Sequence, residues 1–129
     1  MKTDIERAID LFNLGDYLAA AEAFEGSQRG ADPQAKELIS ALNRIAAALH
    51  LRFERGSSRG ALNLLSQALA TLQDLRPERS GVDIDSLCSQ ISAYADELRA
   101  TSHDQAEGLK HRARLFLERR RAPKINRTI

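Results

Sequence analysis

The chain has 129 residues, which is the usual size of one domain and is enough to bury a single hydrophobic core. Aromatic residues make up 5% of it, and 7 glycines and 3 prolines are too few for the many tight turns of a β-sandwich or barrel. The net charge of +1 hides an asymmetry, because residues 1–109 carry 11 basic and 17 acidic side chains, while residues 110–129 carry 8 and 1.

The number of cysteines and the length of the apolar runs indicate the cellular compartment of the protein. Cys88 is alone, so an intramolecular disulfide is excluded and a reducing compartment is favoured. The N-terminus lacks the pattern of a secretory signal, and the longest apolar run, Ile45–Leu49, is too short to span a bilayer. We therefore expect a cytoplasmic protein without a transmembrane segment.

A first helical hairpin is predicted by signals at residues 3–6 and 15–16. Thr3 and Glu6 can form a capping box that begins the first helix. Gly15 ends it, because glycine adopts the left-handed conformation that closes a helix at low cost. Asp16 can then cap a second helix. Apolar residues at helical spacing define the two inner faces: Ile5, Ile9 and Phe12, then Tyr17, Ala20, Ala21 and Phe24.

A second hairpin follows a loop over residues 26–32. Asp32 as cap and Pro33 at the first helical position predict a long central helix over about residues 33–54. Its apolar stripe is Leu38, Leu42, Ile45, Leu49 and Phe53. Residues 55–58 break the chain before a fourth helix. That helix is apolar over a wide arc, which predicts packing on two sides: Ala61, Leu62, Leu64, Leu65, Ala68, Leu69 and Leu72.

Two more helices and a tail complete the predicted order. After a loop over residues 77–82, Asp83 caps a fifth helix, and a second capping box of Ser102 with Gln105 opens a sixth. The inner stripe of the sixth helix is predicted as Ala106, Leu109, Ala113 and Phe116. Pro123 ends it. We expect one helical domain over residues 1–121 and an extended basic tail over residues 122–129.

The two hairpins are related to each other. Phe12, Gly15 and Ala20 recur as Phe53, Gly56 and Ala61 at a constant offset of 41 residues. This pattern, a helix, a glycine turn and a second helix, is locally similar to tetratricopeptide-type hairpins. The predicted fold is therefore all-α: a compact bundle of about five to six helices with two related hairpins, a basic C-terminal helix and a tail.

Candidate catalytic or metal-binding groups are few. Glu22 with Glu25, and His50 with Glu54, have the helical spacing by which carboxylates and histidines can share a metal. We interpret Glu22 and Glu25 as facing solvent or an arginine at the helix edge, and His50 as a hydrogen-bonded histidine at the edge of the apolar stripe. Cys88 lies at core spacing and is interpreted as a small core residue. We expect no catalytic residues, no metal site and no cofactor.

The basic end is the strongest chemical feature of the chain. Arginines and lysines grip carboxylates and phosphates, so we expect a protein partner to bind Arg112, Arg119, Arg120, Arg121, Lys124 and Arg127. Alternatively, these residues complete the helix, aid solubility, or dock on the acidic body of the same chain or of a second copy. Nucleic acid or an anionic membrane is a further alternative, although the tail has no aromatic residue for base stacking.

Together, these motifs resemble the family of small helical proteins called domain of unknown function 309, over about residues 5–98. The matching signature residues are Phe12, Asn13, Gly15, Asp16, Tyr17, Glu22, Glu25, Gly56, Gly60, Gly81 and Asp83. The family's histidine is replaced by Ala21, its tryptophan falls at Gln28, and a second family histidine falls near His50. The resemblance implies a helical fold, and a bacterial cytosol or a plastid stroma as the compartment. If relatives use the histidines as a polar site, Ala21 implies its loss here.

These observations favour a non-catalytic adaptor or assembly-type protein. It would bind a protein partner through helical grooves and its basic C-terminus, and a homodimer is possible. Loss of Arg119, Arg120 and Arg121 together is expected to weaken binding and leave thermal stability nearly unchanged. The alternatives are a metal-assisted hydrolase using Glu22, Glu25 and His50, and a nucleic-acid-binding accessory protein.

Overall fold

The computed structural model describes residues 2–101 and 109–128. Within these ranges the protein is an all-α bundle, as predicted, with one small β-hairpin. The elements are α1 (Asp4–Asn13), α2 (Tyr17–Gly26), α3 (Pro33–Arg55), α4 (Arg59–Gln73), β1 (Glu78–Arg79), β2 (Val82–Asp83), α5 (Ile84–Thr101) and α6 (Leu109–Arg120). None of the described helices is long and apolar enough to cross a membrane.

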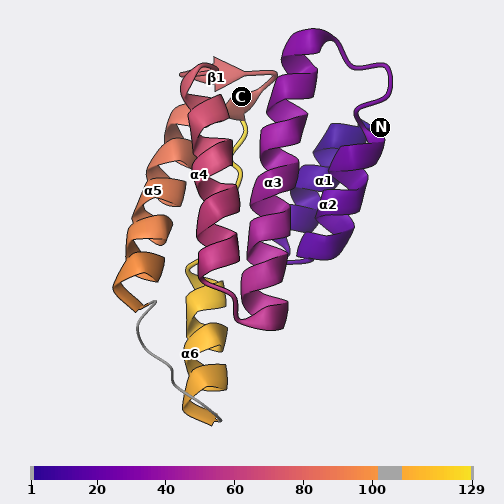
Figure 1. Cartoon of the computed structure of the whole chain (residues 1–129). Coiled ribbons are helices and arrows are strands. Elements are labelled where there is room, and N and C mark those ends of the chain that lie inside the picture. The colour runs from indigo at the N-terminus through magenta and orange to yellow at the C-terminus, as the bar shows by residue number, and fades with distance from the viewer. Residues whose placement is uncertain (1, 102–108, 129) are drawn as a thin grey trace.

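Consecutive helices are neighbours in space. Helix α1 packs on α2, α2 on α3, α3 on α4, and α4 on α5, with the long α3 at the centre (Figure 1). The largest fully buried side chains come from each of these helices, and include Phe12, Phe24, Leu42, Leu65 and Leu87. The predicted pair of related hairpins is present as α1–α2 and α3–α4, with left-handed Gly15 and Gly56 after the first helix of each.

The predicted helix starts are confirmed by their hydrogen bonds. Thr3 and Glu6 form a reciprocal capping box at α1. Asp32 Oδ1 accepts from the Ala35 amide at 2.8 Å, and Pro33 is the first residue of α3. Asp83 Oδ1 accepts from the Ser86 amide at 3.0 Å and caps α5. Each bond satisfies an amide that the first helical turn cannot pair internally.

Helix α4 packs on two sides, as its wide apolar arc predicts. Ala61, Leu65, Ala68 and Leu72 are buried. The remaining leucines of the arc, Leu62, Leu64 and Leu69, are partly buried against the same core. The neighbours of α4 are α3 and α5.

The segment between α4 and α5 contains a hairpin that was predicted as a loop. Strands β1 and β2 pair antiparallel with Arg79 opposite Val82. Ser80 and Gly81 form the turn with φ of 53° and 78°, the positive values that tight two-residue hairpins require. Val82 is buried. Two-residue strands are too short to show alternation, so periodicity could not reveal them.

The C-terminal residues 122–128 run back along the bundle from the end of α6 to the β-hairpin (Figure 1). Ala122 and Ile125 are buried. Arg127 forms an isolated antiparallel β-bridge with Val82 of the hairpin. The Asp83 amide donates to Asn126 O at 2.8 Å, and the Thr128 amide donates to Gly81 O at 2.8 Å. This segment is therefore extended and packed on the helical domain.

The predicted inner face of α6 is wrong at Phe116. Its side chain is 64% exposed, whereas Glu118 is 3% exposed and points into the protein. A buried ion pair, described below, sets the rotation of this helix in place of an apolar stripe. The capping box of Ser102 and Gln105, with Ala106, lies outside the described residues, as do the side chains of Leu109 and Ala113.

Candidate functional site

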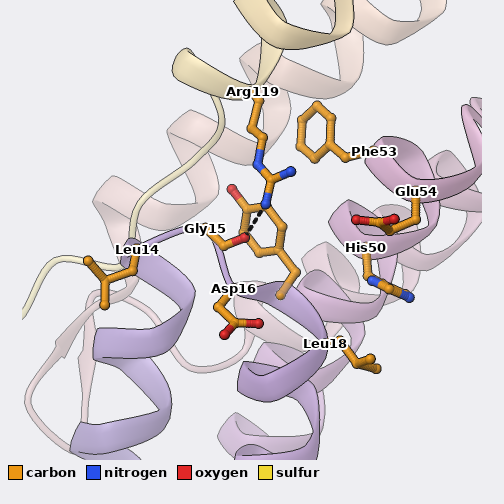
Figure 2. A pocket seen from close by; sticks show the side chains of 9 residues that line it. Leu14, Gly15, Asp16, Leu18, His50, Phe53, Glu54 and Arg119 are labelled. Atoms are coloured by element: carbon orange, nitrogen blue, oxygen red, sulfur yellow. Dashed lines mark hydrogen bonds between the residues drawn. The ribbon is translucent and has the colours of Figure 1, made fainter. Parts of the chain in front are cut away.

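A hollow of about 490 Å³ lies where the α1–α2 turn meets the end of α3 and the end of α6 (Figure 2). The turn and the start of α2 contribute five consecutive residues, α3 contributes three and α6 one: Leu14 to Leu18, then His50, Phe53 and Glu54, then Arg119. Three of these, Gly15, Asp16 and Tyr17, belong to the signature that resembles the domain of unknown function 309. The signature segment therefore forms a surface feature as well as a turn.

The local conformation of the turn exposes two leucines. Gly15 has a φ of +88°, which other residues adopt only with strain, and Asp16 caps α2 by accepting from the Ala19 amide at 3.4 Å. Leu14 lies at the end of α1 and is 82% exposed, while Leu18, in the first turn of α2, is 50% exposed. Large apolar side chains thus stand at the rim of the hollow.

Arg119 joins α6 to this turn. Its guanidinium lies 5.5 Å from the ring centroid of Tyr17 and 5.6 Å from that of Phe53, and its Nη2 donates to Gly15 O (Figure 2). The two rings stack on each other at 5.9 Å. Cation–π contact and the hydrogen bond together hold Arg119 in one position. Arg119 therefore holds α6 against the α1–α2 turn.

The buried hydroxyl of Tyr17 lacks a hydrogen-bond partner in the described part of the chain. Tyr17 is 3% exposed, and burial raises the pKa of its phenol, an effect that the nearby charge of Arg119 partly opposes. The residue therefore stays neutral at physiological pH and contributes mainly ring packing, including an edge contact with Phe12 at 5.2 Å.

The carboxylates of the hollow are not neutralised by neighbouring cations. Asp16 and Glu54 are exposed, and neither forms an ion pair with any residue that the structure describes. His50, one turn before Glu54, also lines the hollow. The two carboxylates outnumber the single guanidinium of Arg119 in the lining, and they stand beside exposed leucine.

The predicted carboxylate pair does not belong to this hollow. Glu22 and Glu25 are exposed on α2 and do not line the site, whereas His50 and Glu54, the other predicted pair, both line it. Within residues 2–101 and 109–128, no group of three or more histidine, cysteine, aspartate or glutamate side chains could hold a metal ion.

The predicted partner-binding cations are mostly engaged within the chain. Arg121 pairs with Glu97, Lys124 Nζ donates to Asn13 O at 3.0 Å, and Arg127 lies 3.5 Å from Asp10. Arg120 is exposed and forms no ion pair with a described residue, and the side chain of Arg112 lies outside the described part. These contacts are of the kind expected from docking on the chain's own acidic body.

A buried charged cluster, which the sequence analysis missed, fixes α6 to the bundle. Glu118 Oε2 and Oε1 accept from Arg52 Nε and Nη2, both at 2.9 Å, and the Tyr94 hydroxyl donates to Glu118 Oε2 at 2.6 Å. Burial, and then the bond to Glu118, raise the pKa of Tyr94. Two signals pointed to it: Arg52 continues the apolar stripe of α3, and Glu118 is the one acid among eight basic residues.

Two amide side chains hold the C-terminal segment. Asn13 Nδ2 donates to Ile125 O and its Oδ1 accepts from the Ile125 amide, both at 2.9 Å. Gln90 makes the same reciprocal pair with Lys124, at 3.1 and 2.9 Å. Asn13, a residue of the family-like signature, thus has a structural role here.

The glycines of the second and third turns also have local roles. Gly56 closes α3 with a φ of +68°. A Cβ added at Gly60 would lie 2.5 Å from Leu51 Cδ2, so the start of α4 approaches α3 closely there. Cys88 is buried, as predicted, and burial raises the pKa of its thiol.

No protein-family model matches this chain, and neither a curated protein nor a solved structure matches it. The resemblance to the domain of unknown function 309 therefore rests on the residues quoted above. The function must be argued from the site itself.

Proposed function

We propose that this chain is a non-catalytic adaptor or assembly-type protein that binds a protein partner at the hollow between the α1–α2 turn, α3 and α6. The observation that carries the proposal is the exposure of Leu14 and Leu18, 82% and 50%, at the rim of a concave surface. Folding gains nothing from leaving large apolar side chains in water, and such side chains beside a hollow are typical of interaction sites.

The residues around the hollow indicate which kinds of side chain the partner would carry. Apolar side chains of the partner would cover Leu14 and Leu18, which flank the hollow, and a neighbouring lysine or arginine would meet Asp16 or Glu54. Of the basic C-terminal residues, we propose Arg120 as the one that binds the partner, because Arg120 is exposed and forms no ion pair with a described residue. Such a site gains affinity from a buried apolar anchor and orientation from the charges at its rim.

Affinity capture followed by reconstitution tests the proposal. Immobilised wild-type chain and two variants, Leu14→Asp and Ala70→Asp, are compared in nuclease-treated lysate of the source cell. The captured protein is then purified and titrated by calorimetry. Ala70 is exposed on α4 and lies away from the hollow, so Ala70→Asp controls for the added charge.

We expect wild type and Ala70→Asp to bind the purified partner equally, and Leu14→Asp to bind it at least tenfold more weakly. Arg120→Glu should weaken binding by a smaller factor. Equal binding by Leu14→Asp and wild type would remove the hollow as the binding surface.

A further inference from the structure

The outward face of α6 carries exposed apolar and basic groups together. Phe116 is 64% exposed and Leu117 is 53% exposed. Arg120 lies four residues after Phe116 and therefore on the same face of the helix. Figure 1 shows α6 projecting past the ends of α3, α4 and α5.

The exposed face of α6 is continuous with the hollow. Arg119 lies three residues after Phe116, and its guanidinium reaches the rings of Tyr17 and Phe53 that line the site. One surface patch therefore holds an apolar and acidic part, Leu14 and Leu18 with Glu54, beside an apolar and basic part, Phe116 with Arg120.

The two parts of this patch complement each other in charge and in apolar character. A two-fold axis brings each part of such a patch against the other part on the partner, so both contacts form twice. We propose that a second copy of this chain occupies the site, with the exposed apolar side chains of α6, Phe116 and Leu117, packing on the two leucines that flank the hollow of the other copy, and with Arg120 facing Glu54. This inference rests on the proposed function, because it names the partner of the same site.

The charge distribution of the whole chain supports a second copy as the occupant. Residues 1–109 carry an excess of six acidic side chains and residues 110–129 an excess of seven basic ones. Several of the described basic side chains are engaged on their own bundle, so the cation that this asymmetry offers to a second copy is Arg120, which forms no ion pair with a described residue. Opposite fields of this kind steer association and align the partners, and they are weakened by salt.

Sedimentation equilibrium of the full chain from 5 to 500 µM, at about 0.05 and 1 M salt, tests the proposal. We expect a monomer–dimer equilibrium whose dissociation constant rises with salt. Phe116→Asp and Leu14→Asp should each raise it at least tenfold, while Ala70→Asp should leave it within twofold. Glu54→Arg and Arg120→Glu should each weaken the dimer, and combining them should recover most of the loss. Circular dichroism verifies that each variant is folded.

A chain that stays monomeric at 500 µM would overturn the proposal, as would a dimer that Phe116→Asp leaves unchanged. The two proposals fail separately. A monomeric chain that binds a different purified protein, and loses it on Leu14→Asp, keeps the proposed function and rejects the second copy as occupant. A dimer that Leu14→Asp leaves unchanged contradicts the dimer geometry, and the calorimetric titration then decides the proposed function alone.

Discussion

The first four helices and the segment from α6 onward are held in place by different forces. Helices α1 to α4 meet through buried apolar side chains such as Phe12, Leu42 and Leu65. The C-terminal segment is held by a buried ion pair at Glu118, by paired amides at Asn13 and Gln90, and by three small or medium-sized buried apolar side chains. Helices α1 to α4 are therefore stabilised mainly by the burial of apolar surface. The C-terminal segment is stabilised mainly by hydrogen bonds and an ion pair, which depend on the exact positions of their donors and acceptors.

That difference predicts how each region tolerates change. Apolar contacts are non-directional, so a conservative exchange in α1–α4 costs little when volume is preserved. A buried carboxylate is stable only when its partners stay in place, because removing one leaves a desolvated charge. Replacing a single polar side chain that holds the C-terminal segment should therefore lower stability more than the small number of atoms removed suggests.

The largest expected effect is that of Glu118→Ala. It leaves Arg52 charged and buried and removes the acceptor of the Tyr94 hydroxyl, so we expect a loss of about 3–5 kcal/mol in the free energy of unfolding. Urea denaturation measures it. Glu22→Ala, on the exposed face of α2, is the matched control and should change stability by less than about 0.5 kcal/mol. A comparable loss in both variants would contradict the distinction between the two regions.

The amide pairs should rank second. Asn13→Ala removes two hydrogen bonds to Ile125, and we expect a loss of about 1–3 kcal/mol together with faster hydrogen exchange at the Ile125 amide. Gln90→Ala should act similarly at Lys124. Unchanged exchange at both amides would show that apolar contacts alone hold the segment.

Tyr94→Phe should show a smaller effect with a distinctive dependence on pH. At neutral pH it removes one bond to Glu118, which costs about 1–2 kcal/mol. The pKa of Tyr94 is raised in the folded state, so its stabilising contribution is complete below the unfolded pKa of about 10 and is lost as pH rises above it. There the unfolded state binds one proton fewer, and stability falls by about 1.4 kcal/mol per pH unit for this group.

Denaturation midpoints measured between pH 8 and 11 check that sign. Tyr94→Phe should lose stability less steeply above pH 10 than wild type. Parallel curves for the two proteins would mean that Tyr94 ionises equally in the folded and unfolded states.

The smallest effects are expected for the arginines at the end of α6. Arg119→Ala removes the contacts with Tyr17 and Phe53 and should cost about 0.5–1 kcal/mol. Arg121→Ala breaks one surface ion pair and should cost less. From the sequence alone, losing all three arginines leaves stability nearly unchanged, whereas the structure assigns the cost to Arg119. Thermal denaturation of Arg119→Ala and Arg121→Ala separates these two expectations. Equal melting temperatures for the two variants would favour the expectation from the sequence.

Much of the fold could be predicted because helix signals are local. The capping box of Thr3 with Glu6, the start at Asp32 and the left-handed Gly15 each act within about four residues, so they need no knowledge of the rest of the chain. The wide apolar arc of α4 likewise predicted two neighbours. For the candidate site, the sequence identified the turn that forms it and its His50 and Glu54, without showing that α6 would close it.

Only the tertiary structure decided which residues far apart in the sequence contact each other. Arg52 and Glu118 are 66 positions apart, and Asn13 and Ile125 are 112 apart. A run of basic residues has the same composition whether it is free or docked, and a lone glutamate can face solvent or a buried arginine. The choice depends on the distance between specific donors and acceptors after α1–α5 have packed. By itself the sequence determined the helices and the apolar faces of α1–α4, whereas packing determined which face of α6 turned inward, which charges were buried and which stayed available for a partner.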